Sequence, residues 1–357
     1  MKHWALVILA ALLPQHVAAQ GLADALAGFD DALAAVPPAG DAGAVGGLND
    51  VFAGFEDAGP VPQPPGGAAN EFALEPEQPL RFSGIFSQRI VVNTGGQAAP
   101  NNGLSSLRSQ LNLTADFTLP GNWRGRVAGN AFYDGAFGLN GRGNYPTGFL
   151  DVYESGVELG EAYVQGALGP NLDLKVGRQV VAWGKSDAIR VTDILNPLDM
   201  RDPGLTDIRD LRLPVTAAKL DYYFGDWNIS AIAIPETRFN KMPVFGSDFY
   251  PGGGPAPLDD QPGEGFGNIE YAVAVNGTFT GWDLSLYGAS VYDDAPHGVM
   301  TGAGLRRRHA RLSMAGAAAN VSTGNLLLKG EVAWLDGLEF LNAPGRSFSR
   351  LDLVVGL

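Results

Sequence analysis

The sequence contains no cysteine, few charged residues and no long hydrophobic run beyond its N-terminus. The absence of cysteine excludes disulfide bonds and thiolate metal sites. Charged residues make up 17% of the 357 positions, too few for a disordered polyampholyte or a coiled coil. The formal net charge of −14 argues against a nucleic-acid partner, because phosphate contacts need a basic surface. Glycine, by contrast, is abundant, with 49 residues.

The N-terminus has the features of a secretory signal peptide at residues 1–19. Lys2 and His3 precede an apolar run from residue 4 to residue 13, and small residues suited to cleavage stand just before Gln20. The run is too short to span a bilayer, which takes ~20 residues, and no later stretch is long enough. A buried N-terminal helix is the alternative. The sequence therefore predicts an exported chain without a transmembrane helix.

Residues 20–79 form an acidic segment rich in alanine, glycine and proline, with ten acidic residues and no basic one. A repeat with a period of 26 residues pairs residues 21–30 with residues 47–56. Apolar residues at helical spacing predict two short helices, which are marginally stable in isolation. Three interpretations stay open for the segment: a solvated linker, a docking arm for a periplasmic partner, or a plug for the lumen of the domain that follows.

From residue 80 to residue 357, apolar and polar residues alternate with a period of two. Leu111, Leu113 and Ala115, for example, are separated by Asn112 and Thr114. Successive side chains of a strand point to opposite faces, so each strand has one apolar and one polar face. The pattern predicts twelve strands, near residues 80–92, 105–119, 122–135, 157–168, 171–183, 213–224, 226–235, 268–280, 282–292, 305–321, 325–336 and 348–357.

The lengths of the connections favour a membrane barrel over a soluble sandwich, which has the same local pattern. Tight turns such as Pro120-Gly121 follow every second predicted strand, whereas the other links are about ten to thirty residues long. Short periplasmic turns and long outer loops alternate in this way in outer-membrane barrels. We therefore predict an all-β fold, an antiparallel transmembrane β-barrel over residues 80–357. Its location would be the outer membrane of a Gram-negative cell, where closure pairs every backbone group.

Aromatic residues stand at two levels of the predicted strands. One group directly follows tight turns, and the other stands towards the opposite ends of its strands. Rings at both levels are typical of the two interfacial girdles of a membrane barrel. The members are Trp123, Trp227 and Trp282 at the turns, and Tyr133, Trp183, Tyr292 and Trp334 at the opposite level.

The most distinctive segment begins with Gly177-Arg178-Gln179-Val180-Val181-Ala182-Trp183-Gly184 and continues to Asn196-Pro197-Leu198-Asp199. Together with Glu161-Ala162-Tyr163 on the preceding strand, it resembles the outer-membrane barrel family called domain of unknown function 1302. The resemblance extends over residues 80–357. That family is similar to porin-type and alginate-export-type barrels.

The resemblance implies a non-enzymatic outer-membrane channel for small or hydrophobic solutes. The alternative that it implies is an export conduit or a docking partner for periplasmic factors and an inner-membrane lipid-type transport system. The chain is shorter than the family pattern and ends at Leu357 instead of an aromatic residue. A complete small barrel and a truncated larger barrel both fit these departures.

The long link from Lys185 to Arg212 is the candidate constriction. Folded inward, its acidic and basic side chains line the passage with a transverse field that sorts solutes by charge. Left outside, they form a solvated surface loop. The candidates are Lys185, Asp187, Arg190, Asp193, Asp199, Arg201, Arg209 and Arg212.

Charged residues inside predicted strands are expected to face the lumen, because Arg or Lys on the lipid face costs ~2–4 kcal/mol at the membrane midplane. These lumen candidates are Arg124, Arg126, Glu161, Arg178, Lys219 and Asp221. A basic cluster at the outer end of a predicted strand could bind lipopolysaccharide phosphates or snorkel at the lipid interface. It consists of Arg306, Arg307, Arg308, His309 and Arg311.

Signals for catalysis are weak, and we predict neither a cofactor nor a metal site. Gly184-Lys185-Ser186 imitates the end of a phosphate-binding loop, but Gln179 stands where that motif requires glycine. Beyond the predicted signal peptide, His297 and His309 are the only histidines. An outer-membrane hydrolase, in which one of them pairs with a distant serine, is the enzymatic alternative.

Overall fold

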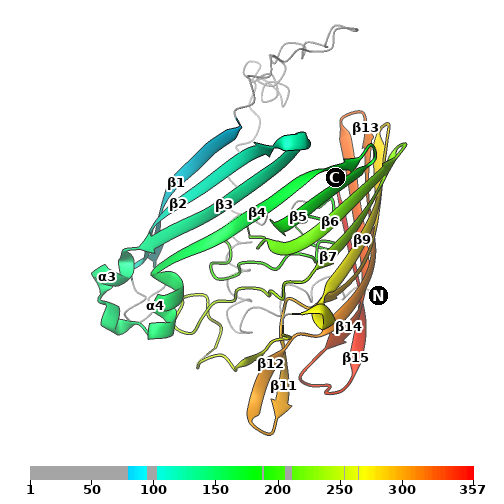
Figure 1. The fold of residues 1–357 in the computed structure, drawn as a ribbon. Helices are drawn as coiled ribbons and strands as arrows, with labels where there is room; N and C mark the ends of the chain where they lie inside the picture. Colours follow the sequence, from blue (N-terminus) through cyan, green and yellow to red (C-terminus); the bar gives the residue numbers. More distant parts are fainter. Residues whose placement is uncertain (1–78, 95–102, 187–188, 206–210, 253, 264) are drawn as a thin grey trace, which may run out of the picture. The chain divides into compact units, whose positions relative to one another are not determined.

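The computed structural model describes residues 79–94, 103–186, 189–205, 211–252, 254–263 and 265–357. Twelve strands form one antiparallel sheet, in the order β1-β2-β3-β4-β5-β6-β7-β9-β10-β13-β14-β15 (Figure 1). They are β1 (Leu80–Asn93), β2 (Gly103–Leu119), β3 (Trp123–Asp134), β4 (Ser155–Gly169), β5 (Leu172–Gln179), β6 (Val215–Phe224), β7 (Trp227–Ile234), β9 (Glu270–Phe279), β10 (Trp282–Tyr292), β13 (Arg311–Thr323), β14 (Leu326–Glu339) and β15 (Ser347–Gly356).

The predicted all-β fold with twelve antiparallel strands is confirmed. The sheet curves round, but among the described residues β1 and β15 remain its two edges and do not pair with each other. The tight turns all lie at one end of the sheet, the turn end, and the long links lie at the other, the loop end (Figure 1). Residues 1–78 lie outside the described part, so the signal peptide and the acidic segment stay predictions.

Two of the predicted strands are wrong in extent. The strand predicted at 171–183 ends at Gln179, because the chain then leaves the sheet. The strand predicted at 305–321 is two strands, since the chain leaves the hydrogen-bonded ladder at His309 and Ala310. Its first half is β12 (Gly304–Arg308), which pairs with β11 (His297–Thr301) and β8 (Asp259–Asp260) in a separate small sheet.

The link between β3 and β4 contains short helices that the alternation pattern did not predict. They are α3 (Ala136–Asn140), η3 (Arg142–Asn144) and α4 (Thr147–Tyr153). Two more short helices lie elsewhere, η2 (Pro120–Asn122) in the turn between β2 and β3 and η4 (Phe266–Asn268) just before β9. Phe137, Tyr145, Phe149 and Tyr153 pack together, with ring centroids 4.8–5.3 Å apart. The four-residue spacing of the last three aromatic residues is the helical signal that was missed. In the described part, no helix has the length and apolar character needed to cross a bilayer.

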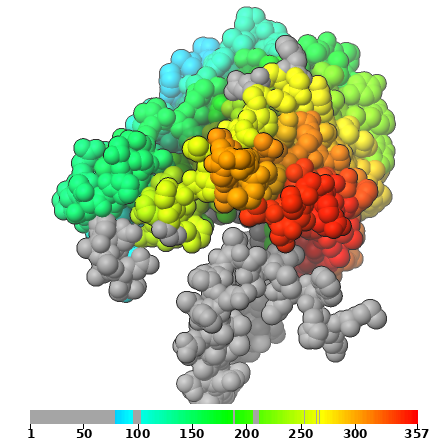
Figure 2. Space-filling model, turned by 90° about the horizontal axis from the view of Figure 1, so that it is seen from below, coloured from blue at the N-terminus to red at the C-terminus, as the bar shows by residue number. Residues whose placement is uncertain are grey.

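Figure 2 looks at the loop end of the sheet. The α3–α4 region, the chain between β7 and β9, and the β11–β12 hairpin lie next to one another there. The loop end is therefore built from segments that are far apart in the sequence.

The strand register separates two faces of the sheet. One face, here called the outer face, carries exposed apolar side chains such as Phe82, Phe86 and Leu353, with Tyr133 and Trp334 among them. The other, the inner face, is the one against which residues beyond β5 fold. Trp183 lies on this inner side and is only 8% exposed, so its predicted place in an outer girdle is wrong.

Candidate functional site

The chain between β5 and β6 folds onto the inner face of the sheet. We call its described residues, 180–186, 189–205 and 211–214, the inward segment. Val181, Trp183, Val191 and Leu195 are buried against residues of β6, β7, β9, β10, β13 and β14. The Trp183 ring stacks on Tyr287 of β10, with centroids 4.7 Å apart. Of the two arrangements left open by the sequence, the structure therefore has the inward one.

Small side chains on the inner face allow this close approach. Ala272, Ala274, Ala318 and Ala333 are buried under the inward segment. At Gly316, an added Cβ would lie 3.0 Å from Thr192 Cγ2 and 3.1 Å from the Val332 carbonyl oxygen. The row of small residues on β9, β13 and β14 thus provides the space that the segment occupies.

Residues of the family motif hold the base of the inward segment. The Asn196 side chain accepts a hydrogen bond from Val181 N (2.7 Å) and donates one to the Leu213 carbonyl oxygen (2.8 Å). Gln179 Nε2 donates to the Ala217 carbonyl oxygen of β6 (3.0 Å). Both side chains are fully buried, and these bonds satisfy the Asn196 amide and Gln179 Nε2, which would be costly to leave unpaired there. The motif therefore closes the segment on itself and attaches it to β6.

A single carboxylate, Glu331 of β14, holds the opposite side of the segment. It accepts hydrogen bonds from Lys185 N (2.5 Å), Ser186 N (2.5 Å), Thr192 N (3.3 Å) and Thr192 Oγ1 (2.9 Å). The Glu331 residue is 3% exposed, so these bonds compensate a buried charge. Gly184, with φ +86°, lies against it: an added Cβ would be 2.8 Å from Glu331 Oε1. Glycine in the motif thus permits both the backbone conformation and the approach of the carboxylate.

Four of the predicted constriction residues form ion pairs in or beside the inward segment. Asp193 Oδ2 lies 3.0 Å from Arg190 Nε and 2.7 Å from Arg212 Nε. Lys185 Nζ lies 2.7 Å from Asp283 Oδ1 of β10. These charges hold the shape of the segment, and their role as a filter stays a prediction. The candidates Asp187 and Arg209 lie outside the described residues.

Asp199 and Arg201 form the next pair, with Arg201 Nη2 at 2.5 Å from Asp199 Oδ2. Burial raises the pKa of the Asp199 carboxyl, but the hydrogen bonds and charge of Arg201 outweigh this, so its pKa lies below the ordinary value. Main-chain hydrogen bonds join the same stretch to the β7–β9 link, from Met200 N to the Lys241 carbonyl oxygen (2.8 Å) and from Lys241 N to the Leu198 carbonyl oxygen (2.9 Å). The segment is therefore part of a packed layer at the loop end.

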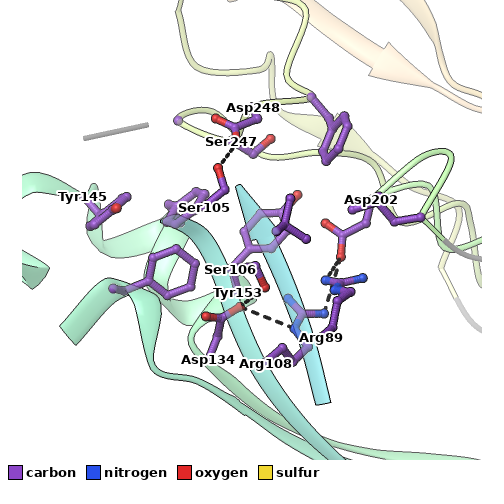
Figure 3. A pocket seen from close by; sticks show the side chains of 16 residues that line it. Arg89, Ser105, Ser106, Arg108, Asp134, Tyr145, Tyr153, Asp202, Ser247 and Asp248 are labelled. Atoms are coloured by element: carbon purple, nitrogen blue, oxygen red, sulfur yellow. Dashed lines mark hydrogen bonds and ion pairs between the residues drawn. The ribbon is translucent and has the colours of Figure 1, made fainter. Parts of the chain in front are cut away.

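The far end of the segment is tied to the first strands of the sheet (Figure 3). Asp202 Oδ2 lies 2.6 Å from Arg89 Nη2 of β1 and 3.4 Å from Arg108 Nη1 of β2. The register places these two arginines directly opposite each other, so Asp202 bridges two like charges. Asp134, which is fully buried, accepts a hydrogen bond from Ser106 Oγ (2.5 Å).

This network and the aromatic cluster of the α3–α4 region line an open cavity of about 50 Å³. Tyr153 at its edge donates a hydrogen bond to the Arg201 carbonyl oxygen (3.1 Å). Arg89, Arg108 and Asp134 were not among the residues predicted from the sequence. Their position on the polar face of predicted strands was the available signal.

The strand charges predicted to face the lumen lie mainly on the inner face. Arg126 Nε is 2.7 Å from Asp116 Oδ1, and Arg126 Nη1 is 3.6 Å from Glu161 Oε2. Lys219 Nζ is 2.9 Å from Asp221 Oδ2. The register also places Arg124 on the inner face, opposite Thr118 and Gln165. In addition, Lys175 lies opposite Lys219, with its ammonium 3.7 Å from the centroid of the Tyr163 ring.

The prediction that Arg178 faces the lumen is wrong. Its register partner is Thr216, on the outer face that also carries Val176 and Leu220. The side chain pairs with Glu236, at 2.6 Å, beside the loop end of β5. The prediction assumed the cost of an unpaired arginine on the lipid face, whereas the ion pair with Glu236 compensates the charge of Arg178 there.

The basic cluster is already partly neutralised. Arg307 Nη2 lies 3.0 Å from Asp259 Oδ2, and Arg308 Nε lies 2.8 Å from Asp260 Oδ2. Binding of lipopolysaccharide by this cluster stays a prediction.

The two histidines do not pair with serine among the described residues. His309 Nδ1 is 2.7 Å from the Asp293 carbonyl oxygen, and His297 Nε2 is 3.3 Å from Glu339 Oε2. Nor does the described part bring three His, Asp or Glu side chains together as a metal ion would require.

Comparison with curated proteins finds no match. Among solved structures, a mutant of the Rh. blastica porin matches with a TM-score of 0.30 and 9% sequence identity, over 76% of this chain and 92% of that chain. OmpF of Salmonella typhi, in a complex with daunomycin, matches with a TM-score of 0.31 and 12% identity, over 75% of this chain and 82% of that chain. Such weak likeness has no bearing on function.

A protein-family model also matches the chain. It covers residues 92–349 and thus includes the sheet from the end of β1 to the start of β15, the inward segment and the motif residues that hold it. The chain therefore belongs to the family described as protein of unknown function (DUF1302).

Proposed function

We propose that this chain forms a channel in the outer membrane of a Gram-negative cell, through which small solutes pass. The observation that supports the proposal is the difference between the two faces of one sheet. Its outer face is apolar, whereas its inner face carries charges and a folded-in segment. A protein in water has no reason to expose the apolar face.

The outer face has the properties of a lipid-facing surface. Phe82, Phe86 and Ile90 on β1, and Leu351 and Leu353 on β15, are among the most exposed apolar residues of the sheet. Each backbone group inside a bilayer needs a hydrogen-bond partner, so a sheet edge cannot remain free there. We therefore expect β1 and β15 to be paired in the membrane, either with each other or with further strands.

The inner face offers a passage along β2–β6. The inward segment covers the apolar inner residues of β6–β14, and the charges of β2–β6 stay partly exposed beside it. Arg126, Lys175 and Lys219 contribute positive charge to this wall, and Asp116, Glu161 and Asp221 contribute negative charge. Charges of both signs on one wall orient and select solutes by their charge as they pass.

Reconstitution of the mature protein in planar bilayers tests the proposal. We expect discrete conductance steps. Their absence from protein that keeps its β-sheet circular dichroism would contradict a channel.

The double substitution Lys175→Glu and Lys219→Glu tests the path. It should move the reversal potential in a salt gradient towards cation selectivity, because both side chains belong to the proposed wall. Arg346→Glu, which reverses an exposed charge in the β14–β15 link, is the matched control and should leave the reversal potential unchanged. Equal shifts in the two variants would exclude the path along β2–β6.

A further inference from the structure

A second, larger cavity lies at the loop end and differs in character from the charged wall. Its volume is about 520 Å³, within the usual range of small-molecule sites. Four separate parts of the chain contribute to its walls: the α3–α4 region, the link between β7 and β9, the chain before β11, and the β12–β13 junction. Figure 2 shows the α3–α4 region, the link between β7 and β9 and the β11–β12 hairpin next to one another at this end.

Prolines and other apolar residues dominate the walls. Pro146 comes from the α3–α4 region, Pro243 and Pro255 from the link between β7 and β9, and Pro296 from the chain before β11. Proline has no backbone N–H and a fixed φ, so it presents no main-chain donor to a ligand and loses little entropy when a ligand binds. Phe149, Met242 and Phe245 add apolar side chains. Such walls suit an apolar molecule rather than an ion.

The polar side of the cavity is formed by Asp259, Arg307 and His309. The Arg307–Asp259 pair is 3.0 Å apart and leaves no net charge between these two residues. A charged ligand would therefore lose hydration in this cavity without gaining an unbalanced partner.

His309 supplies a hydrogen-bond acceptor. Its Nδ1 lies 2.7 Å from the Asp293 carbonyl oxygen, which can only accept, so Nδ1 carries the proton. Burial lowers the pKa of His309, which keeps the ring neutral at pH 7 and leaves Nε2 as an acceptor. That Nε2 is buried and has no hydrogen-bond partner among the described residues.

The cavity adjoins the inward segment. Asn240, one of its lining residues, accepts a hydrogen bond from Leu198 N of the segment (2.6 Å). A molecule bound in the cavity would thus be held beside the layer that the inward segment forms at the loop end.

We propose that this cavity binds a neutral, mainly apolar organic molecule that carries a hydroxyl group. The apolar body lies against the prolines, Met242 and Phe245, and the hydroxyl group donates a hydrogen bond on the side of His309. The inference rests on the proposed channel in one respect, since it makes the cavity the site where such a molecule collects before entry.

Fluorescence titration of the full chain in detergent, with three naphthalene compounds, tests the proposed site. We expect 2-naphthol to bind more tightly than naphthalene, because only the former has the hydroxyl donor, and naphthalene-2-sulfonate to bind most weakly. Tightest binding of the sulfonate would overturn the inference, and so would equal binding of all three compounds.

Two substitutions locate the site. Met242→Asp places a carboxylate in the apolar wall and should weaken 2-naphthol binding about tenfold, because the ligand then displaces water from a charge. Met242 is 42% exposed, so the substitution is compatible with folding. Met300→Asp, at a 69% exposed position of β11 outside the cavity, is the matched control and should not change the affinity. Equal affinities of the two variants would place the bound ligand elsewhere and refute the site.

His309→Phe keeps a ring to stack on Phe239 but removes the acceptor. The preference for 2-naphthol over naphthalene should disappear, with naphthalene affinity unchanged, and a retained preference would contradict the role of His309. If this variant does not fold, the three-compound series with the unaltered protein still tests whether the cavity prefers a hydroxyl donor. Conductance tests the channel separately. Conductance steps with no effect of Met242→Asp on binding would contradict the site and support the channel. Binding that Met242→Asp weakens, without conductance steps, would contradict the channel and support the site.

Discussion

The inner face of the sheet has two halves that differ in what covers them. On β2–β5, charged and polar side chains such as Arg126, Glu161 and Lys175 remain partly exposed. On β7–β14, small and apolar side chains such as Ala274 and Ala318 are buried under the inward segment. The strand β6 belongs to both halves, with Val215 and Ala217 under the segment and Lys219 and Asp221 on the charged wall.

The difference between the halves shows that the inner face is not polar throughout, although the outer face is apolar. A strand that faces lipid on one side and a packed segment on the other needs apolar residues on both, whereas a strand that faces water on its inner side alternates. Small inner residues therefore mark the part of the sheet that the chain itself fills. Substitutions on the two faces of the sheet and at the two ends of the inward segment test this interpretation of the inner face.

The largest expected effect comes from comparing a tryptophan on each face. Trp183→Ala removes a buried ring from the contact between segment and sheet and should lower the free energy of unfolding by about 3–5 kcal/mol. Trp334→Ala removes a ring that is 53% exposed on the outer face and should cost clearly less. Urea unfolding in the same detergent measures both. Equal losses would show that the inward packing of Trp183 stabilises the fold no more than a ring on the outer face does.

The next effect concerns the carboxylate that holds the segment. The two carboxylate oxygens of Glu331 together accept four hydrogen bonds, whereas the amide in Glu331→Gln has one acceptor oxygen. At least one charge-assisted bond, worth about 1.5–3 kcal/mol, is therefore lost. Trypsin should then cleave faster after Lys185 and Arg190. Glu339→Gln, on the same strand but at its exposed end, is the control. A cleavage rate equal to that of the control would contradict the role of Glu331 in holding the inward segment.

A smaller effect is expected at the other end of the segment. Asp202→Asn weakens the bridge to Arg89 and Arg108 and, because the partners are partly exposed, should cost roughly 1 kcal/mol. Amide hydrogen exchange should accelerate around Asp202 and leave the segment near Glu331 unchanged. Asp226→Asn, in an exposed turn at the opposite end of the sheet, serves as the control. Acceleration along the whole segment would mean that its two ends do not hold independently.

The smallest effect is a pH dependence at Asp199. The pKa of this carboxyl lies below its ordinary value in the folded protein, so its contribution is present above the unfolded pKa of about 3.8 and is lost as the pH falls below it. The difference in unfolding free energy between the unaltered protein and Asp199→Asn should therefore shrink between pH 5 and pH 3. A difference that grows over this interval would reverse the assigned sign.

Much of the sheet could be predicted from local sequence. Alternation over 111–115 and the tight turns located strands that the structure contains, because period and turn chemistry depend on neighbouring residues. The extent of β5 could not be predicted this way. Val181 and Trp183 continue an apolar pattern, and only the partners Tyr287 and Glu331, more than a hundred residues later, show that the chain has left the sheet.

The candidate site was predicted in part for the same reason. The stretch from Lys185 to Arg212 was identified by its charge, and its partners Asp283 and Glu331 were not. Arg178 was misplaced because a charge in a strand was assumed to face inward wherever it stands. The proline-lined cavity had no local signal, since its walls come from four distant stretches.

The sequence by itself determined the presence and approximate places of the twelve strands, their pairing direction and the family motif, because these depend on periodicity and on residues close together in the chain. The tertiary structure alone decided that the segment lies inside, which half of the inner face it fills and where the loop-end cavity forms. Those outcomes depend on side chains that come into contact only after the sheet has curved. They also depend on the free energy gained when the apolar side chains of the inward segment are buried against the row of small residues.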